Sequence, residues 1–299
     1  MSFTIATSVD EALAALAGGA RPIAGGTDLV VSSRQGKVPL PSDLVAIDRI
    51  TELGGVTTAD DGGIEIGALS SHATLMADPL VIERATAVAD AAALVGSPAT
   101  RHVGTLGGNL MNGSPAMDTG APLVVLGAEV ELRSSAGRRT VPVAELWTGP
   151  GATVAATDEL CTSVVVPAGT ATSGSAYVRL EYRRAMEIAV VGAAAAVTLA
   201  GDGSLAAVSV ALAAVAPTIV SVDTSHLVGR FPDDELLAAV ADAASERAAP
   251  ISDLRASDRY RRHTVGVMAR RAVDAASRRA AGEQIAVPVN RALGIGAAS

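Results

Sequence analysis

The sequence predicts an α+β protein with an N-terminal region of two subdomains and a smaller C-terminal domain, in which a three-stranded sheet is backed by helices. The chain has 299 residues, which is more than one typical domain core holds. Strand-like and helix-like runs alternate in its first part, whereas its last part has three strand-like runs followed by two helices. Residues 168–174 (AGTATSG) separate these parts with Gly, Thr, Ser and Ala. We therefore expect domains at residues 1–170 and 171–299.

Local signals place the elements of the first subdomain, which we expect to end near residue 56. Ser8 can cap a helix at 9–17, with Glu11 at the capping-box position and two glycines, at 18–19, as the stop signal. The other expected elements are strands at 3–6, 21–24 (short and buried) and 44–47, a helix at 28–35, and a turn or helix start at 48–53. This order indicates a small α/β unit.

The pattern changes around residues 54–63, where the second subdomain begins. Two alternating runs, 129–133 and 138–143, are separated by a turn and predict a hairpin. The other expected elements are strands at 64–66 and 160–166, and helices at 73–77 (capped by Ser70 or Ser71), from Pro79 onward, at 85–95 and at 121–126.

The C-terminal domain is predicted from longer runs. Strand-like segments at 176–181, 189–199 and 206–215 give the three-stranded sheet, and a Gly-Asp-Gly turn joins the last two. Helical patterns follow at 233–246 and 257–281. Three strands followed by two helices are typical of a sheet covered by helices on one face.

Composition excludes several classes of function. The net charge is −8 without a basic block, which argues against nucleic-acid binding. Cys161 is the only cysteine, so an intramolecular disulfide and a cysteine-held iron–sulfur cluster within this chain are excluded. The N-terminus has no basic and apolar signal segment, and the uncharged run at 188–201 is too short to span a bilayer. We expect a cytoplasmic protein without a membrane span.

Two stretches, 22–28 (PIAGGTD) and 105–109 (TLGGN), combine a Gly-Gly pair with hydrogen-bonding side chains. Adjacent glycines let backbone N–H groups approach a ligand with no Cβ in the way. Exposed N–H groups at turns and at helix N-termini bind anions. Either stretch alone is also accounted for as a tight connection. The pair in one chain predicts a ligand, with one turn for each half of a diphosphate.

The side chains offer little chemistry of their own. The four histidines, at 72, 102, 226 and 263, lack metal-ligand spacing. There is no nucleophile elbow, no Walker A loop and no GxGxxG fingerprint after a strand. Cys161 lies in an apolar run, as a buried thiol would. We therefore expect a bound cofactor to supply the chemistry.

The motifs together resemble a known family. Residues 24–28 (AGGTD), 101–109 (RHVGTLGGN) and 114–118 (SPAMD) resemble the FAD-binding medium subunit of molybdenum hydroxylases, the carbon-monoxide dehydrogenase and xanthine dehydrogenase type. Residues 177–189 (YVRLEYRRAMEIA) are similar to the family's Tyr-x-Lys-x-x-x-Arg-Arg segment, and 252–262 (SDLRASDRYRR) to its C-terminal domain. The resemblance covers nearly the whole chain in order.

This resemblance implies a vanillyl-alcohol oxidase-like flavin fold, with FAD extended between subdomains at about 1–56 and 57–170. It implies non-covalent FAD and no catalytic residue or metal ligand in this chain. The implied cofactor-binding residues are Ala24, Gly25, Gly26, Thr27, Asp28, Val95, Thr105, Gly107, Gly108, Asn109, Asp118, Cys161, Arg179 and Ile188.

The resemblance also assigns parts of FAD to these residues. Residues 24–28 and 105–109 correspond to the diphosphate and its neighbourhood. Val95 and Ile188 correspond to positions flanking the isoalloxazine ring. Cys161 stands where the family often has an apolar residue, usually leucine, near the flavin.

Asp118 and three departures from the family pattern leave questions open. Asp118 matches a flavin contact, but it can also cap the helix at 121–126. Arg179 replaces a lysine that approaches the ring, keeping the charge but in a planar fork. His102 replaces the usual asparagine. Met186 stands where some xanthine dehydrogenases have an acidic residue associated with NAD, so the electron acceptor stays open. We expect alanine at 109 or 118 to lower flavin content without unfolding the protein.

The implied function is electron transfer within a complex. A large partner subunit with the molybdenum cofactor oxidises substrate, a small partner carries two [2Fe–2S] clusters, and this chain passes electrons through FAD to an external acceptor. A dimer of heterotrimers is implied. The alternatives are a self-contained flavin oxidase of the vanillyl-alcohol oxidase superfamily, often with covalent FAD, and a flavin-free scaffold. The substrate (carbon monoxide, a purine, an aldehyde or an N-heterocycle) and the acceptor are not determined.

Overall fold

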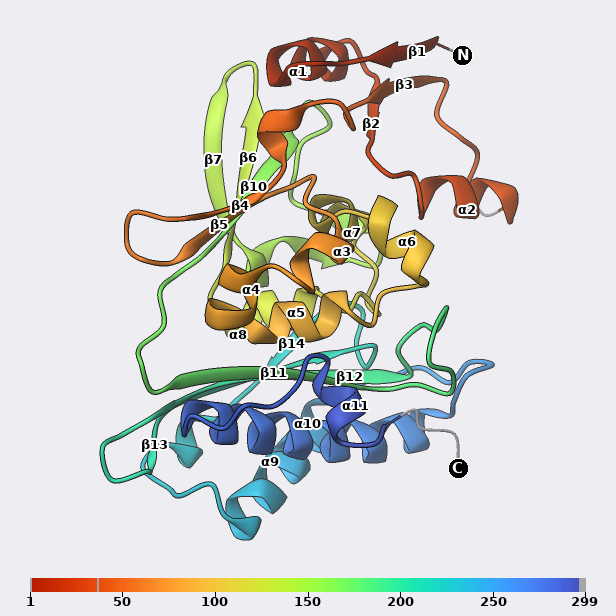
Figure 1. Cartoon of the computed structure of the whole chain (residues 1–299). Helices are drawn as coiled ribbons and strands as arrows, with labels where there is room; N and C mark the ends of the chain where they lie inside the picture. Colours follow the sequence, from red (N-terminus) through yellow and green to blue (C-terminus); the bar gives the residue numbers. More distant parts are fainter. Residues whose placement is uncertain (1, 37, 296–299) are drawn as a thin grey trace.

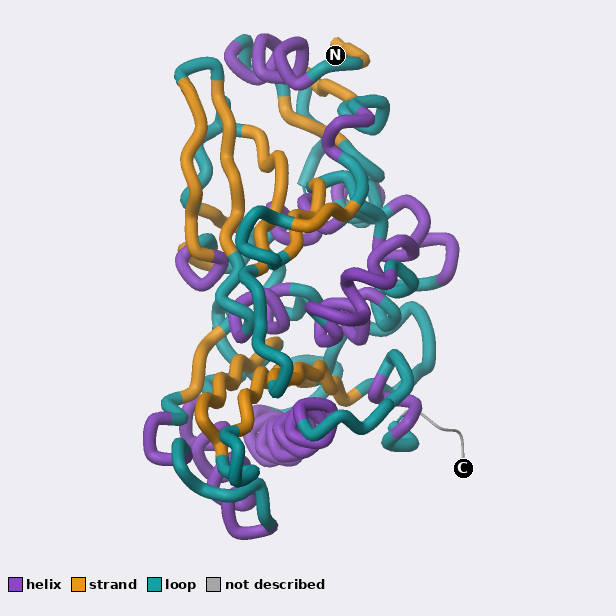
Figure 2. The backbone as a smooth tube through the Cα atoms, turned by 60° about the vertical axis from the view of Figure 1, so that its left-hand side comes forward, coloured by secondary structure: helices purple, strands orange, loops and turns teal. Residues whose placement is uncertain are grey.

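The computed structural model describes residues 2–36 and 38–295, and its elements lie in three tiers (Figure 1). A small sheet with α1 (Val9–Ala17) lies at one end. A five-stranded sheet and a group of short helices form the middle. A four-stranded sheet backed by the long helix α10 (Asp258–Ala280) forms the other end, and the turned view shows the same sequence of tiers (Figure 2). The predicted α+β class is confirmed.

The first tier is the predicted small α/β unit. Its parallel sheet has the order β1-β3-β2, with α1 against it. The Ser8 hydroxyl caps α1 by accepting from the N–H of Glu11 at 3.3 Å. The Glu11 carboxylate accepts from the N–H of Thr7 at 2.7 Å, so the reciprocal half of the expected capping box is displaced by one residue. The other elements are β1 (Ser2–Ile5), β2 (Arg21–Ile23), α2 (Leu29–Arg34), β3 (Asp43–Ala46) and η1 (Thr51–Leu53).

Strand β2 is an edge strand, and its residues are exposed or half-buried, so the expectation that it is buried was wrong. An edge strand has a neighbour on one side only. This exposure leaves the chain that follows β2 open to solvent, where the first Gly-Gly pair lies.

The middle tier has a five-stranded antiparallel sheet in the order β4-β5-β10-β6-β7. Apolar residues on one face, among them Ile66, Val130 and Val164, pack against the helices. The hairpin β6–β7 confirms the prediction, whereas β4 and the pair β8–β9 were missed because strands of two or three residues show no alternation. The bounds are β4 (Val56–Thr58), β5 (Ile64–Gly67), β6 (Glu129–Ser134), β7 (Gly137–Pro142), η2 (Val143–Glu145), β8 (Trp147–Gly149), β9 (Ala152–Thr153) and β10 (Leu160–Val166).

The helices of this tier are short, and most begin at a capping side chain. Ser71 caps α3, Asp78 caps α4, Ser97 caps α6 and Thr105 caps α7. The predicted helix 85–95 is α5, which ends earlier than expected. The bounds are α3 (His72–Leu75), α4 (Pro79–Arg84), α5 (Thr86–Ala92), α6 (Pro98–Val103), α7 (Leu106–Asn112) and α8 (Gly120–Val125).

The C-terminal sheet is antiparallel with the order β11-β12-β13-β14. The predicted three strands are present, but the short edge strand β14 makes a fourth, so the strand count was wrong. Helices α9 and α10 pack on one face, and α5 and α8 of the middle tier cover the other. The bounds are β11 (Ser173–Leu180), β12 (Val191–Leu199), β13 (Leu205–Ala213), β14 (Val220–Val222), η3 (Ser225–Leu227), α9 (Asp234–Arg247) and α11 (Val289–Ala292).

Because helices cover both faces of the C-terminal sheet, the side chains of β11 are buried in two different cores. Ala176 and Val178 belong to the core shared with α10, whereas Tyr177 belongs to the core of the middle tier. Because side chains alternate along a strand, Arg179 shares a face with Tyr177. The C-terminal domain therefore contributes these two side chains to its boundary with the middle tier. Among the helices described, none combines the length and apolar character needed to cross a membrane.

Candidate functional site

The two Gly-Gly stretches, far apart in sequence, meet in the structure. A Cβ on Gly25 would lie 1.9 Å from the carbonyl oxygen of Val103, the last residue of α6. A Cβ on Gly104 would lie 3.5 Å from the hydroxyl of Thr27. The loop between β2 and α2 therefore packs directly against the connection between α6 and α7, and glycine is required for this approach.

The loop at 25–28 offers unsatisfied backbone donors. Within residues 2–36 and 38–295, the N–H groups of Gly25, Gly26, Thr27 and Asp28 have no hydrogen-bond acceptor. Gly26 adopts φ = 67°, a left-handed conformation that favours glycine. Successive N–H groups around such a residue form a concavity that binds anions. This loop therefore has the donors that a diphosphate requires.

Asp28 follows this loop and does not cap α2 with its side chain. Although the residue is exposed, protein atoms surround its carboxylate closely enough that desolvation raises its pKa.

The second Gly-Gly pair is arranged differently from the prediction. It follows a helix, not a strand, and lies in the first turn of α7. The first three N–H groups of α7 donate to the Ser70 carbonyl (3.0 Å), the Ala68 carbonyl (2.8 Å) and the Thr105 hydroxyl (3.1 Å). The expectation that these N–H groups are open to a ligand is therefore wrong. Gly107 instead allows close packing, since its Cβ would lie 2.7 Å from that of Ala68.

In this stretch, Gly108 and the side-chain amide of Asn109 remain accessible to a ligand. Gly108 is exposed, so its surface is open to a ligand. The Asn109 Oδ1 accepts from the Thr119 hydroxyl at 2.6 Å, which fixes the side chain. Its Nδ2 group has no acceptor in the part of the chain that the structure describes, so two N–H donors remain for a ligand.

Asp118 lies in a buried network rather than at a helix cap. Thr119 occupies the N-cap of α8, and no side chain caps that helix. The Asp118 carboxylate accepts from the Tyr177 hydroxyl at 2.8 Å and from Nη1 of Arg179 at 2.7 Å. Of the two roles considered for Asp118, the capping role is therefore wrong.

Arg179 is fully buried between two carboxylates. Its Nε donates to Glu181 at 2.9 Å, opposite the contact with Asp118, and none of its side chain is exposed. Burial opposes the charge of Arg179, but Asp118 and its neighbours raise the pKa above the ordinary value. Burial, followed by the Asp118 charge, raises the pKa of Tyr177. In this arrangement the guanidinium group pairs with two buried carboxylates and has no exposed surface.

The two residues expected beside the isoalloxazine ring lie near each other. The N–H of Met186 donates to the Gly96 carbonyl at 2.9 Å, which brings the segment after β11 against the residue that follows Val95. The Val95 carbonyl accepts from Arg101 at 2.9 Å. Ile188 is 47% exposed at this boundary. The middle and C-terminal tiers therefore meet where the ring was expected.

Cys161 is not brought to that surface. It lies on β10, buried in the core of the middle tier. Burial, with a smaller effect of Glu131, raises the pKa of its thiol to about 12. The thiol is therefore protonated and packed, as the apolar run predicted.

The remaining candidates lie along one continuous path. The path starts at loop 25–28, which packs against Val103 of α6, and reaches Asn109 on α7. The Thr119 hydroxyl donates to Asn109 there, and Asp118 precedes Thr119 in the chain. Desolvation and then the nearby Arg291 and Arg179 lower the pKa of Arg101, so positive charge gathers at the far end. Such a path suits an elongated ligand with an anionic centre.

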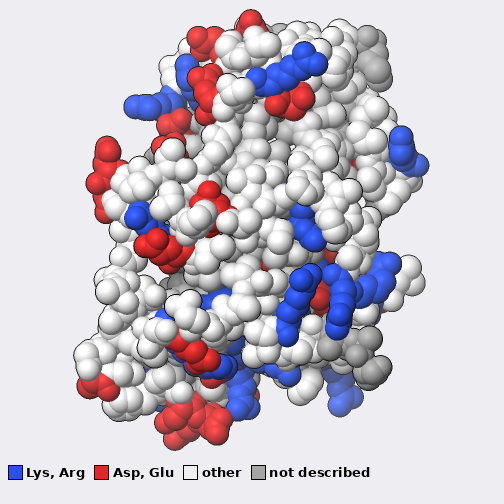
Figure 3. All heavy atoms as spheres, in the orientation of Figure 1, with Lys and Arg blue, Asp and Glu red and all other residues white. Residues whose placement is uncertain are grey.

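Surface charge is distributed unevenly, although the net charge is −8. Figure 3 shows Lys and Arg side chains gathered on the right-hand side at the level of the C-terminal sheet, and acidic side chains towards the top and bottom. Arg183, 66% exposed in its side chain, pairs with Glu187 and donates to the Met186 carbonyl at 2.7 Å.

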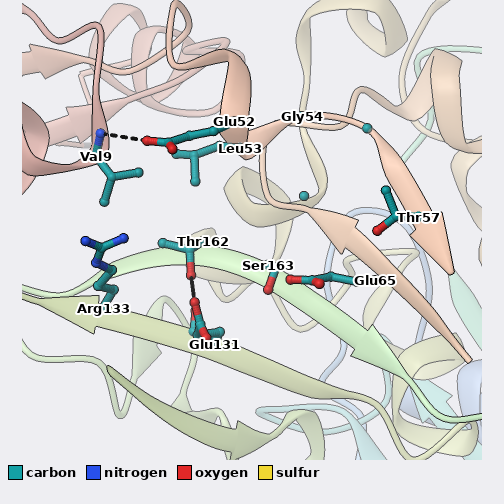
Figure 4. A pocket seen from close by; sticks show the side chains of 12 residues that line it. Val9, Glu52, Leu53, Gly54, Thr57, Glu65, Glu131, Arg133, Thr162 and Ser163 are labelled. Atoms are coloured by element: carbon teal, nitrogen blue, oxygen red, sulfur yellow. Dashed lines mark hydrogen bonds between the residues drawn. The ribbon is translucent and has the colours of Figure 1, made fainter. Parts of the chain in front are cut away.

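A pocket elsewhere does not coincide with these residues. It has a volume of about 270 Å³ and lies between α1, η1 and the outer face of the five-stranded sheet (Figure 4). Carboxylates at Glu52, Glu65 and Glu131 line it, and the Glu52 carboxylate accepts from the N–H of Val9 at 3.1 Å. None of the candidate cofactor residues lines this pocket, and its carboxylates would repel a diphosphate.

His72 is a buried residue that the sequence reasoning considered only as a metal ligand. Its ring is 2% exposed, and burial, with a smaller effect of Arg101, lowers its pKa to about 4. No sequence pattern distinguishes it from the other histidines, since burial depends on the packing of α3.

Lowering the pH from 7 to 4 is expected to destabilise the fold through His72. The unfolded chain binds a proton near pH 6.5, whereas the folded chain binds it only near pH 4. The stabilisation is therefore complete above pH 6.5 and declines as the pH falls through this window, by about 3 kcal/mol in total. Urea unfolding at pH 7, 5.5 and 4 should show a shallower decline in His72→Leu than in the wild type, with exposed His226→Leu as control. Parallel declines in all three proteins would contradict the prediction.

Comparisons with known proteins agree over nearly the whole chain. The family model described as the FAD binding domain in molybdopterin dehydrogenase matches residues 1–169, and the CO dehydrogenase flavoprotein C-terminal domain matches residues 176–276. The carbon monoxide dehydrogenase medium chain of Hydrogenophaga pseudoflava is 33% identical over 279 residues, covering 92% of this chain and 96% of that one. The putative xanthine dehydrogenase FAD-binding subunit of Escherichia coli K12 is 30% identical over 267 residues, covering 88% and 91%.

A solved structure gives the same result for the fold. The carbon monoxide dehydrogenase from Hydrogenophaga pseudoflava that lacks the Mo-pyranopterin moiety of the molybdenum cofactor matches with a TM-score of 0.87 and 32% identity. The match covers 92% of this chain and 96% of that chain.

Proposed function

This chain belongs to the FAD-binding medium subunits of molybdenum hydroxylases, and from that premise we propose that it takes electrons from [2Fe–2S] clusters of a partner subunit and passes them to an external acceptor. It is an oxidoreductase component. The observation that carries the proposal is the loop at 25–28 beside the second Gly-Gly stretch, because four of its N–H groups have no acceptor among the described residues.

FAD supplies the electron-carrying chemistry when it is bound, and the residues of this chain bind and orient it. Loop 25–28 holds the diphosphate through its N–H groups, and the Asn109 amide donates beside it. Arg101 places positive charge at the ring end of the path. Residues 186–188 cover the ring from the C-terminal side. The other contacts that we propose are Ala24, Val95, Thr105, Gly107, Gly108, Asp118, Cys161 and Arg179.

Two of these proposed contacts need a local rearrangement. Arg179 has no exposed surface, so a direct ring contact requires its guanidinium to leave Asp118 or Glu181. Cys161 is equally enclosed and reaches the cofactor only through packing. Both residues are proposed to act mainly by supporting the wall of the site.

The division into domains at residues 1–170 and 171–299 also remains our proposal. The two family matches, at 1–169 and 176–276, support it. In the structure β11 begins at Ser173, inside the stretch in which we place the boundary.

The partners are proposed from the same relatives. A chain named as a medium chain has larger and smaller companions, which supports a large subunit with the molybdenum cofactor and a small iron–sulfur subunit. We propose a dimer of such heterotrimers in the cytoplasm. Substrate choice then lies in the large subunit, outside this chain.

The test is an absorption spectrum of the purified chain, with mass identification of any flavin released on denaturation. The chain is expressed alone and together with its genomic neighbours. Non-covalent FAD in both preparations, with iron and molybdenum only in the second, supports the proposal. Covalent flavin with turnover by the chain alone would favour a self-contained oxidase. Absence of flavin from both would favour a scaffold.

Asn109→Ala is expected to weaken FAD binding about tenfold, because the variant loses the two free donors of the amide. The fold loses the contact with the buried Thr119 hydroxyl, so the free energy of unfolding should fall by about 1–3 kcal/mol and the variant should stay folded. Equilibrium dialysis against FAD measures the effect. Asn112→Ala, the same change at the last residue of α7, is the matched control. Equal affinity in both variants would remove Asn109 from the site.

A further inference from the structure

His72 is held against the connection between the two Gly-Gly stretches. It is the first residue of α3, and its backbone N–H donates to the Gly104 carbonyl at 3.1 Å. The preceding residue, Ser71, forms a bridge with Thr105. These contacts fix the position of the imidazole at the start of the TLGGN stretch.

One edge of the ring faces the junction of the two stretches. The ring atom Cδ2 lies 3.3 Å from where a Cβ of Gly104 would be, and the same point lies 3.5 Å from the Thr27 hydroxyl. Nε2 is bonded to Cδ2 in the ring and therefore lies on this edge. Because Gly104 has no side chain, no atom of that residue fills the space between this edge and Thr27.

Neither ring nitrogen has a partner among the residues that the structure describes. Nδ1 is completely buried without a hydrogen bond. Nε2 is not among the completely buried atoms, and no described group bonds it, so it is the nitrogen that a ligand can reach. Nε2 is therefore the ring nitrogen whose hydrogen bond remains available to a ligand.

The charge state of the ring fits a neutral donor. Burial and the nearby Arg101 keep the imidazole unprotonated near neutral pH. A neutral imidazole carries one N–H, and the other nitrogen has a lone pair. With the hydrogen on Nε2, the donor lies on the edge that faces the junction.

We propose that His72 is a further FAD-binding residue, whose imidazole N–H donates a hydrogen bond to the cofactor's diphosphate. The inference rests on the proposed function, because it requires that the chain bind FAD. It adds a side-chain donor to the backbone donors of loop 25–28, since His72 and Thr27 both lie beside Gly104.

A binding role and a purely structural role of His72 predict different results for the variant His72→Leu. His72→Leu removes both nitrogens and keeps much of the bulk. Because the ring makes no hydrogen bond in the protein itself, the variant loses none, and its thermal unfolding without ligand should be unchanged or shifted upward. A packing role predicts lower thermal stability and unchanged affinity.

The experiment uses the full chain freed of flavin and three probes: FAD, ADP and riboflavin. ADP carries the diphosphate without the ring, and riboflavin carries the ring without the diphosphate. His72→Leu should raise the Kd for FAD and ADP by the same factor, about tenfold, and leave riboflavin unchanged. His72→Gln, which keeps a donor near the position of Nε2, should restore most of the affinity.

The outcomes separate the two proposals. Wild-type chain that binds none of the probes would overturn the proposed function. If His72→Leu binds FAD as tightly as the wild type does, the role of His72 is overturned, whereas the proposed function is not. Should the leucine variant fail to fold, nitrogen-15 NMR of wild-type imidazoles decides, since ADP must shift the His72 ring resonances and leave those of exposed His226 in place.

Discussion

Replacing Asp118 with alanine is expected to lower the free energy of unfolding by about 3–5 kcal/mol, the usual cost of leaving a buried charge without its partner. Arg179 has no exposed surface and would keep only Glu181, and the Tyr177 hydroxyl would lose its acceptor as well. The resemblance alone predicted loss of flavin with the fold intact. The structure changes that prediction, because the carboxylate is part of the boundary between the middle and C-terminal tiers.

Chemical unfolding followed by circular dichroism measures this effect. Asp10→Ala, which breaks the exposed pair with Arg133 at 3.0 Å, is the matched control and should cost less than 1 kcal/mol. Asp118→Asn keeps an acceptor for Tyr177 and should fall between the two. A loss below 1 kcal/mol for Asp118→Ala would show that the buried pair contributes little, and flavin content would then report directly on cofactor contact.

Gly25→Ala is expected to destroy the junction of the two Gly-Gly stretches. The new Cβ would lie 1.9 Å from the oxygen and 2.6 Å from the carbon of the Val103 carbonyl, and both atoms are backbone. Relief requires the whole loop to move away from α6, because no side chain can rotate aside. We expect overpacking to cost about 3 kcal/mol and FAD affinity to fall at least a hundredfold.

Flavin content after purification and the thermal unfolding midpoint measure both consequences. Gly201→Ala is the control, since a Cβ at this turn position meets nothing within 4 Å. Retention of full flavin by Gly25→Ala, with an unchanged midpoint, would show that the loop does not need this close approach.

Local signals in the sequence were sufficient wherever one short segment decides its own conformation. Ser8 caps α1, and the Gly-Asp-Gly turn joins β12 to β13, because each effect acts within a few residues. The long strands and α10 were predicted because their apolar periodicity extends over many residues. Strands β4 and β14 were missed because three residues carry no period.

In the site, too, some features were predictable from the sequence and others depend on the tertiary structure. The sequence by itself determined which residues are glycine, hydroxyl, amide and carboxylate in the two motifs, and through them the family. Only the tertiary structure decided how each is used. The first three N–H groups of α7 are satisfied by Ala68, Ser70 and Thr105, whereas those of loop 25–28 have no acceptor in the part of the chain that the structure describes. Asp118 pairs with a side chain 61 residues away. The physical reason is that hydrogen bonds and burial depend on which segments the fold brings together, and a local sequence pattern carries no information about a partner from another part of the chain.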